Sequence, residues 1–178
     1  EKQIKIENND NLETLTKKLS DLSSELILRA ISEIEQNKNR DINLLLKKQT
    51  DFQRELKYAR MINKLDYIIN WEKSSTDIYR KINAFYPRAN TTYKRKNLKI
   101  IKIKILTTHE IHNKNYKILS NVFKPGLIIG LIKNVGIIIT TKTDPILLLE
   151  AKLEGKKVSS QNQLIQQLNP EIGENFSD

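Results

Sequence analysis

The 178-residue sequence contains no cysteine, which excludes disulfide bonds and metal sites built from thiolates. No apolar run is long enough to span a bilayer, because lysines interrupt the isoleucine and leucine clusters every few positions. The five glycines form no glycine-rich phosphate-binding loop, and we expect no signal peptide at the start of the chain. The chain begins at Glu1 without an initiator methionine, so we expect it to be part of a longer protein.

Acidic side chains are almost missing from one part of the chain. Residues 1–60 carry 12 basic and 11 acidic side chains, whereas residues 61–178 carry 19 and 10. Between Arg80 and Lys142 there are 14 basic residues and a single acid, Glu110. Charge concentrated in this way indicates a polyanionic partner. The alternative is a compositional bias toward Ile, Lys and Asn, which does not explain why the acids vanish from one segment only.

The first part of the chain predicts one strand and one long helix. Residues 2–7 alternate as the last strand of a sheet would, and Asp10 with Glu13 suggests a capping box. Leucines then recur at helical spacing over residues 12–34. One strand and one helix cannot bury this stripe, so we expect them to be the trailing edge of an α/β domain. Residues 36–64 are polar and predict a connecting segment that is partly helical.

The second part of the chain changes from helix to strands. A helix is predicted from about Thr76, capped by Ser74 with Asp77 and ended by Pro87. Short strands separated by turn signals follow, which is typical of a small barrel or sandwich. These strands are expected at Leu98–Leu106, Gly126–Lys133, Gly136–Thr141 and Pro145–Glu150. Ser160 with Gln163 predicts a short closing helix, and the tail Asn169–Asp178 is expected to be a loop.

The strand after Pro87 alternates isoleucine with lysine. We expect Ile101, Ile103 and Ile105 to fill the interior, with Lys102 and Lys104 on the outer face. Lysines lack the bidentate fork of arginine and therefore favour phosphate contacts over base recognition. The cations in and just before this strand are the predicted nucleic-acid-binding residues: Arg88, Lys94, Arg95, Lys96, Lys99, Lys102 and Lys104.

Aromatic residues and candidate catalytic residues add little to this prediction. Tyr86 and Tyr93 either stack on a base or pack internally, and Trp71 is expected to anchor the core. His109 and His112 lack the H-E-x-x-H spacing of a zinc site, so no metal site is predicted. No pair of acids suits general acid–base chemistry either. We therefore predict no catalytic residue in this chain, whose role is binding.

An ordered series of short motifs resembles the methionyl-tRNA formyltransferase family. That family has a Y-A…K…D…I-D-W stretch, an I-R-A-F-x-P-W-P segment, a P-G turn, a G-I strand and a G-K-K turn. The matching residues here are Tyr58-Ala59, Lys64-Leu65-Asp66, Ile69-Asn70-Trp71, Ile82-Asn83-Ala84-Phe85-Tyr86-Pro87, Pro125-Gly126, Gly136-Ile137 and Gly155-Lys156-Lys157. The preceding segment N-L-E-T-L-T-K-K-L-S-D-L resembles the family's D-T-x-x-L-x-x-K-L, which closes its catalytic domain.

The resemblance implies a cytoplasmic enzyme that moves a formyl group from 10-formyltetrahydrofolate to the amino group of methionyl initiator tRNA. The implied fold class is α+β, in three parts. Residues 1–44 would end a Rossmann-like catalytic domain, residues 45–64 would be a linker, and residues 65–178 would form a small OB-like β-barrel with flanking helices that binds tRNA. The family's catalytic Asn, His and Asp lie upstream of these residues, as does the site of the formyl donor. We expect a monomer without a membrane segment.

The chain departs from the family pattern at three places. Asn70 stands where the family commonly has Asp, Asn83 where it has Arg, and Arg88-Ala89 replaces Trp-Pro. Arg88 restores a cation close to the one lost at Asn83. Two other functions are compatible with the sequence: a non-catalytic OB-like nucleic-acid-binding module, and a folate- or sugar-directed formyltransferase relative. The latter would have no need of so one-sided a charge.

Overall fold

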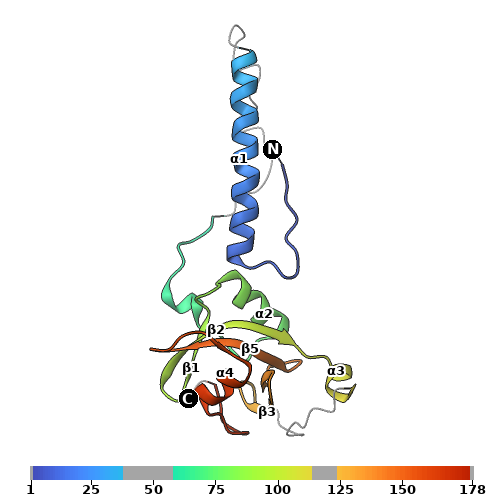
Figure 1. Ribbon diagram of the computed structural model, residues 1–178, viewed down its shortest axis with the longest axis vertical. Coiled ribbons are helices and arrows are strands. Elements are labelled where there is room, and N and C mark those ends of the chain that lie inside the picture. The colour runs from blue at the N-terminus through green and yellow to red at the C-terminus, as the bar shows by residue number, and fades with distance from the viewer. Residues whose placement is uncertain (1, 38–57, 114–123, 177–178) are drawn as a thin grey trace. The chain divides into compact units, whose positions relative to one another are not determined.

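A computed structural model describes residues 2–37, 58–113 and 124–176 of the chain (Figure 1). The chain divides into two compact units, Glu1–Ile62 and Asn63–Asp178. We call them the N-terminal unit and the C-terminal unit. Most of the predicted connecting segment, with the greater part of the linker 45–64, lies outside the described residues.

The described part of the N-terminal unit contains one helix, α1 (Leu12–Gln36), as its leucine spacing predicts. The capping box is formed by Asn11 and Thr14, so the prediction of Asp10 with Glu13 is wrong by one position. Asp10 is engaged elsewhere, because it accepts the Glu7 N–H and forms an ion pair with Lys18 at 2.7 Å. The hydrogen bond from Lys18, followed by that from Glu7, lowers the pKa of Asp10.

The predicted strand at residues 2–7 is wrong, because this segment forms no strand in the part of the chain that the structure describes. A strand needs a partner to satisfy its backbone N–H and C=O groups, and no described residue pairs with this one. The described residues also leave the leucine stripe of α1 incompletely covered, since no residue of the helix is buried. Large apolar side chains of α1 are exposed at Leu12, Leu19, Ile27, Leu28, Ile31 and Ile34.

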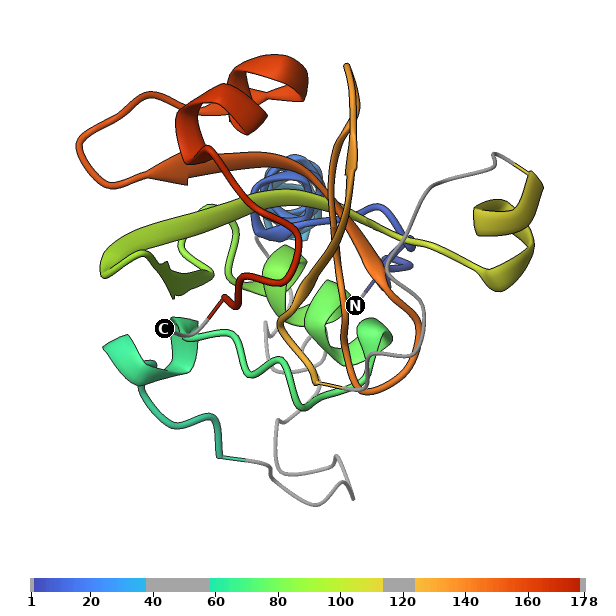
Figure 2. The ribbon, with the colours of Figure 1, turned by 90° about the horizontal axis from the view of Figure 1, so that it is seen from below.

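The C-terminal unit is built on a twisted antiparallel sheet (Figure 2). Its elements are the 3-10 helix η3 (Lys64–Tyr67), α2 (Ser75–Ala84), β1 (Asn90–Tyr93), β2 (Lys96–Ile105), α3 (Thr108–Asn113), β3 (Ile128–Ile132), β4 (Gly136–Ile139), β5 (Ile146–Leu153), β6 (Ser159–Ser160) and α4 (Gln161–Leu168). The strand order is β1-β2-β5-β4-β3, and β6 pairs with β5. This mixture of helices and antiparallel strands is the α+β class that the sequence predicts. The sheet is compatible with an OB-like barrel, although the pairings among described residues do not join β1 to β3.

Local sequence signals explain most of these elements. Ser74 caps α2 by accepting the Asp77 N–H, as predicted, and the helix ends at Ala84, before Pro87. Ser160 precedes α4 as its N-cap but makes no side-chain capping bond, so the box with Gln163 is not formed. The predicted strands from β2 to β5 are all present. The prediction from the sequence did not include β1, β6 or the short helices η3 and α3.

The larger core lies on one face of the sheet, against α2, α4 and the tail that follows α4. Trp71, predicted as a core anchor, is 3% exposed and donates a hydrogen bond from Nε1 to Thr91 Oγ1 at 3.1 Å. Tyr93 is buried as well, so of its two predicted roles internal packing is the one observed. A smaller apolar cluster contains residues of β3, β4 and β5 together with Leu106.

Strand β2 changes the alternation of its side chains half-way along. Leu98 and Ile100 are buried, then the register with β5 shifts between Ile100 and Ile103, and Ile103 is the next buried residue. The expected interior position of Ile101 is therefore wrong, because a β-bulge adds a residue there and leaves it half-buried. Ile103 is buried as predicted and Ile105 is half-buried against the larger core.

This difference predicts unequal effects of two neighbouring substitutions. Ile100→Ala removes a fully buried side chain and should lower the free energy of unfolding by about 2–5 kcal/mol. Ile101→Ala removes the same atoms from a half-buried site and should cost clearly less. Urea unfolding of the two variants measures both values. Equal losses, or a larger loss at Ile101, would contradict the position of the bulge.

Candidate nucleic-acid interface

Strands β1 and β2 form a β-hairpin, and its turn carries two cations. Tyr93 pairs with Lys96, and the turn residues Lys94 and Arg95 have φ values of +47° and +61°. A two-residue hairpin turn with positive φ at both positions normally uses Asn-Gly, Asp-Gly or Gly-Gly. Lys-Arg lacks this signature, which is why the sequence did not predict the hairpin. Positive φ costs a non-glycine residue roughly 1 kcal/mol, so surrounding contacts must hold the turn.

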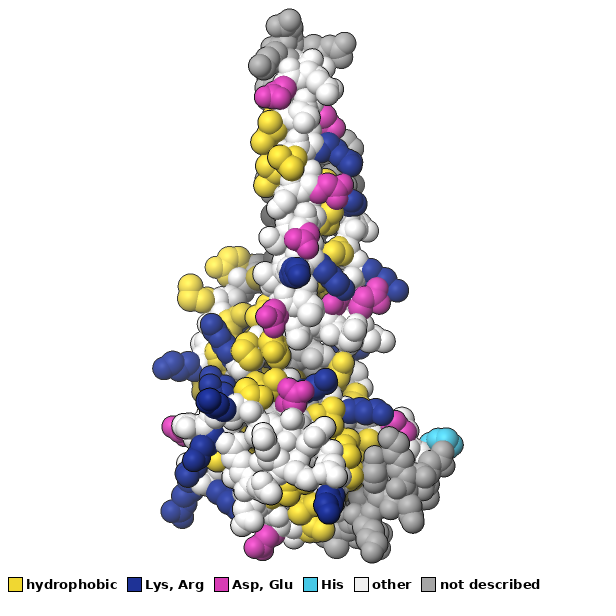
Figure 3. All heavy atoms as spheres, viewed as in Figure 1, with side chains coloured by type: hydrophobic (Ala, Val, Ile, Leu, Met, Phe, Trp, Pro, Cys, Tyr) yellow, Lys and Arg dark blue, Asp and Glu magenta, His cyan; other side chains and the backbone are white. Residues whose placement is uncertain are grey.

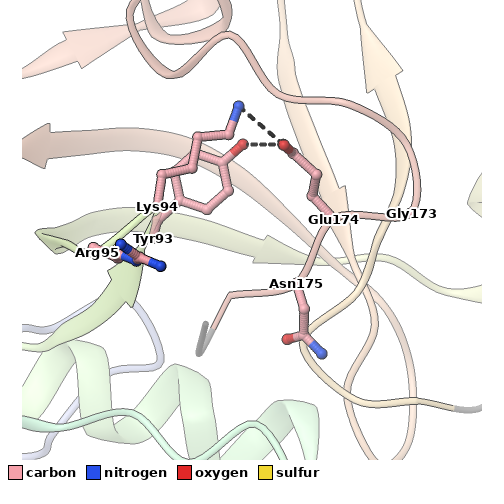
Figure 4. A pocket seen from close by; sticks show the side chains of 6 residues that line it. All are labelled: Tyr93, Lys94, Arg95, Gly173, Glu174 and Asn175. Atoms are coloured by element: carbon pink, nitrogen blue, oxygen red, sulfur yellow. Dashed lines mark hydrogen bonds and ion pairs between the residues drawn. The ribbon is translucent and has the colours of Figure 1, made fainter.

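Contacts from the tail after α4 hold the turn in place (Figure 4). Lys94 Nζ lies 3.0 Å from Glu174 Oε1 and 2.7 Å from the carbonyl oxygen of Asn169. It also lies 5.3 Å from the centroid of the Tyr93 ring. The Tyr93 hydroxyl donates a hydrogen bond to Glu174 Oε2. Glu174 therefore fastens both the last residue of β1 and the first residue of the turn to the tail.

The protonation states of these groups follow from their surroundings. Burial alone would raise the pKa of Glu174, but hydrogen bonds from Tyr93, the Glu171 N–H and Lys94 outweigh it and lower the pKa. Burial raises the pKa of Tyr93, and its hydrogen bond to Glu174 raises it further. At neutral pH Glu174 is therefore a carboxylate and Tyr93 a neutral phenol. The charge of Lys94 is partly neutralised by this carboxylate.

A pocket of about 270 Å³ opens beside the turn (Figure 4). It is lined by Tyr93, Lys94, Arg95, Gly173, Glu174 and Asn175. Unlike Lys94, Arg95 makes no ion pair with any residue in the described ranges. Its guanidinium lies at the tip of the hairpin, where a ligand can approach it.

The turn after β5 brings further lysines to the same end of the sheet. Asn97 and Glu154 are joined by two hydrogen bonds, from the Glu154 N–H to the Asn97 carbonyl at 2.9 Å and from the Asn97 N–H to Glu154 Oε2 at 3.1 Å. Figure 2 shows the loop after β5 and the start of β2 on the same side. We call the following residues the basic end: Lys94, Arg95, Lys96, Lys99, Lys156 and Lys157.

The exposed cations of the C-terminal unit gather visibly on one flank. Figure 3 shows Lys and Arg side chains along the left side of this unit, where Figure 1 shows β1 and the tip of β5. Lys96 and Lys99 are exposed, as are Lys156 and Lys157. Such a concentration of cations attracts polyanions and raises the rate at which they associate.

Lys102 and Lys104 lie farther along β2 and are exposed, as predicted, but each has an acidic neighbour. Lys102 Nζ lies 3.8 Å from Glu150, which β5 contributes, and Lys104 Nζ lies 2.5 Å from Glu110 of α3. The hydrogen bond from Lys104 is the main cause that lowers the pKa of Glu110. The structure therefore divides the predicted binding residues of the hairpin into two groups. Lys94, Lys102 and Lys104 each have an ion pair with an acid, whereas Arg95, Lys96 and Lys99 have none with a described residue.

Arg88 lies before β1, away from the hairpin turn. Its guanidinium Nη1 lies 3.2 Å from the Tyr67 hydroxyl and its Cζ lies 5.9 Å from the centroid of that ring. The Tyr67 ring in turn packs edge-on against Phe85. The cation that replaces the family's Trp is thus held against an aromatic surface.

Three cations near this interface were not among the predicted binding residues. Lys156 and Lys157 were noted only as part of the G-K-K turn of the family resemblance, and Lys152 on β5 was not singled out. Their position depends on the pairing of β2 with β5, in which Leu98 lies opposite Leu153. A sequence contains no signal for pairing between strands so far apart, although the alternation of Lys152 with buried Ala151 and Leu153 marks it as outward-facing.

Other kinds of site find no support among the described residues. Within the ranges given above, no three His, Cys, Asp or Glu side chains are close enough to hold a metal ion. The side chain of His112 lies outside the described set. No described helix is long and apolar enough to cross a membrane.

Residues 61–169 match the profile of the formyl transferase C-terminal domain. The chain belongs to the formyl transferase family. It is 96% identical over all 178 residues to the methionyl-tRNA formyltransferase of Prochlorococcus marinus subsp. pastoris (strain CCMP1986 / NIES-2087 / MED4), of which it covers 54%. It is 33% identical over 179 aligned residues to the methionyl-tRNA formyltransferase of Synechococcus sp. (strain CC9311), where the match covers 94% of this chain and 52% of the relative. This formyl transferase chain thus spans about half the length of the curated relatives it matches.

Solved structures with the same fold are more distant in sequence. A variant of HypX from Aquifex aeolicus matches 97% of this formyl transferase chain and 28% of its own chain, with a TM-score of 0.60 and 13% identity. A HypX structure in complex with tetrahydrofolic acid covers 85% of this chain and 24% of its own, with a TM-score of 0.50. At this level of identity the likeness shows the fold.

Proposed function

We propose that this chain is the C-terminal part of a methionyl-tRNA formyltransferase. That enzyme transfers the formyl group of 10-formyltetrahydrofolate to the amino group of methionyl initiator tRNA. Two findings support the proposal. The 96% identical relative is named methionyl-tRNA formyltransferase, and the match to the formyl transferase C-terminal domain covers residues 61–169. Residues 1–44 then end the catalytic domain, residues 45–64 are the linker and residues 65–178 are the tRNA-binding domain. The protein works in the cytoplasm as a monomer.

The chemistry belongs to residues outside this chain. The pocket beside the hairpin turn does not suit the folate donor. Tyr93 is the aromatic residue that lines this pocket, and Phe176 already stacks on the face of its ring. Tyr93 is 2% exposed and stacks on Phe176 with 4.7 Å between ring centroids. Pockets for drug-sized ligands are mostly apolar and about 300–1,000 Å³ in volume. This pocket is smaller and is lined by two cations and a carboxylate.

The role of this chain is to hold the tRNA through its phosphates. The binding residues are those expected from the sequence, together with two lysines after β5: Arg88, Lys94, Arg95, Lys96, Lys99, Lys102, Lys104, Lys156 and Lys157. The observation that carries the proposal is the basic end, where segments distant in the sequence bring cations together. Arg95 and Lys96 there form no ion pair with a described residue. Lys and Arg contacts to phosphates supply most of the sequence-independent affinity for nucleic acid.

A direct experiment separates binding from catalysis. The purified chain, mixed with 10-formyltetrahydrofolate and methionyl initiator tRNA, should form only background amounts of formyl-methionyl-tRNA. The same preparation should bind the tRNA, with an affinity that falls linearly in log–log form as salt rises. Filter binding at several salt concentrations and acid–urea gels of the tRNA measure the two properties. Turnover well above background would mean that catalytic residues lie in this chain, and absence of salt-dependent binding would contradict the binding role.

A further inference from the structure

Two lysines on neighbouring strands lie directly opposite each other on the outer face of the sheet. Lys99 of β2 pairs with Lys152 of β5, and both side chains are exposed. Their neighbours along each strand, such as Ile100 and Ala151, are buried in the larger core. Side chains alternate along a strand, so both lysines leave the face away from that core. The Cβ atoms of directly opposed residues lie about 4.5–5.5 Å apart.

This arrangement is unfavourable for the free protein. Like charges directly opposite each other on a sheet destabilise it. The acids two residues before and two residues after Lys152 are engaged elsewhere. Glu150 lies 3.8 Å from Lys102, and Glu154 accepts the Asn97 N–H at 3.1 Å. Neither Lys99 nor Lys152 has an ion pair with a residue in the described ranges.

An anion between the two ammonium groups would relieve this repulsion. Each group has three N–H donors and no fixed fork, which suits the oxygens of a phosphate and gives no selectivity among bases. Lys99 also belongs to the basic end, so a ligand bound there is continuous with the proposed tRNA surface. A phosphodiester of the RNA backbone has the charge and the acceptor oxygens that the pair requires.

We propose that Lys99 and Lys152 form a two-lysine site for one backbone phosphate of the bound tRNA, and that Lys152 is a binding residue. This inference rests on the proposed function. It has a consequence that an ordinary surface lysine lacks. Removing one charge of the pair should weaken RNA binding and at the same time stabilise the folded protein.

The test compares variants of the 178-residue chain by tRNA binding and thermal unfolding. Lys152→Gln should lower the slope of log affinity against log salt by at most about 0.7–0.9, the share of one phosphate contact, because Lys99 still faces that phosphate. It should also raise the midpoint of thermal unfolding. Lys152→Glu should raise that midpoint further, since the new carboxylate faces Lys99, and should reduce affinity more than Lys152→Gln. Lys152→Arg keeps the charge and should keep the slope.

Lys17→Gln on α1 is the matched control for net charge, because Lys17 is exposed and distant in sequence from the sheet. It should leave the slope unchanged. If Arg95→Asn lowers the slope while the Lys152 variants do not, the two-lysine site is overturned and the proposed function stands. A lower unfolding midpoint for Lys152→Gln overturns the site as well. Absence of salt-dependent binding by the unsubstituted chain overturns both.

Discussion

Replacing Phe176 with alanine should lower the free energy of unfolding of the C-terminal unit by about 3–5 kcal/mol. Phe176 is fully buried although it lies in the tail that the sequence predicted to be a loop. Its ring stacks on Tyr93, with centroids 4.7 Å apart, and lies 5.7 Å from the centroid of Trp71. Its N–H donates to the Gly126 carbonyl at 2.8 Å. Loss of the ring leaves a cavity among residues that all belong to one core.

The neighbouring Ile172 provides the matched control. It lies in the same tail but is 52% exposed, so Ile172→Ala should change stability by about 0.5 kcal/mol or less. Urea unfolding followed by tryptophan fluorescence measures both variants, because Trp71 is the single tryptophan. Equal, small effects of the two substitutions would show that the tail is not part of the core.

Loss of the Phe176 side chain should also disturb the conformation of the hairpin turn. Glu174 lies two residues before Phe176 and holds Lys94 and Tyr93. The positive φ values of Lys94 and Arg95 depend on such contacts. The tail therefore links the packing of the core to the position of the proposed binding residues.

The elements with strong local signals could be predicted from the sequence. Helix α2 follows from its Ser74 cap and from Pro87, and β2 follows from its alternation of isoleucine and lysine. The predictions failed where the backbone geometry departs from the usual geometry of turns and strands. The hairpin turn at Lys94 lacks the usual glycine or asparagine, and the β-bulge at Ile101 shifts the alternation by one residue.

The candidate site was predicted less completely than the fold, because charge in three dimensions depends on strand pairing. Lys102 is one of many lysines in an acid-poor segment of the sequence, yet β5 brings Glu150 to its side. The same pairing brings Lys152 opposite Lys99. Composition identified an acid-poor segment that contains β1 and β2, but it could not say which of its cations pair with acids.

The largest effect on binding is expected from four substitutions at the basic end: Arg95→Asn, Lys96→Gln, Lys156→Gln and Lys157→Gln combined. If each cation meets one phosphate, the slope of log affinity against log salt should fall by about 3–4. Affinity for initiator tRNA near 0.15 M salt should fall on the order of 100- to 1,000-fold. Stability should change little, since the four side chains are exposed or at the turn, and asparagine tolerates the positive φ of Arg95.

The double variant Lys102→Gln with Lys104→Gln is the comparison, because it removes cations from the same strand that already have acidic neighbours. Each of these lysines must leave its carboxylate to meet a phosphate, so the slope should fall by less than about 1–2, the value for two unpaired contacts. Both variants are compared by filter binding over the same range of salt, with thermal unfolding to confirm the fold. If the fourfold variant keeps its slope while the double variant loses it, the tRNA lies along the far part of β2 and the hairpin turn is not its contact.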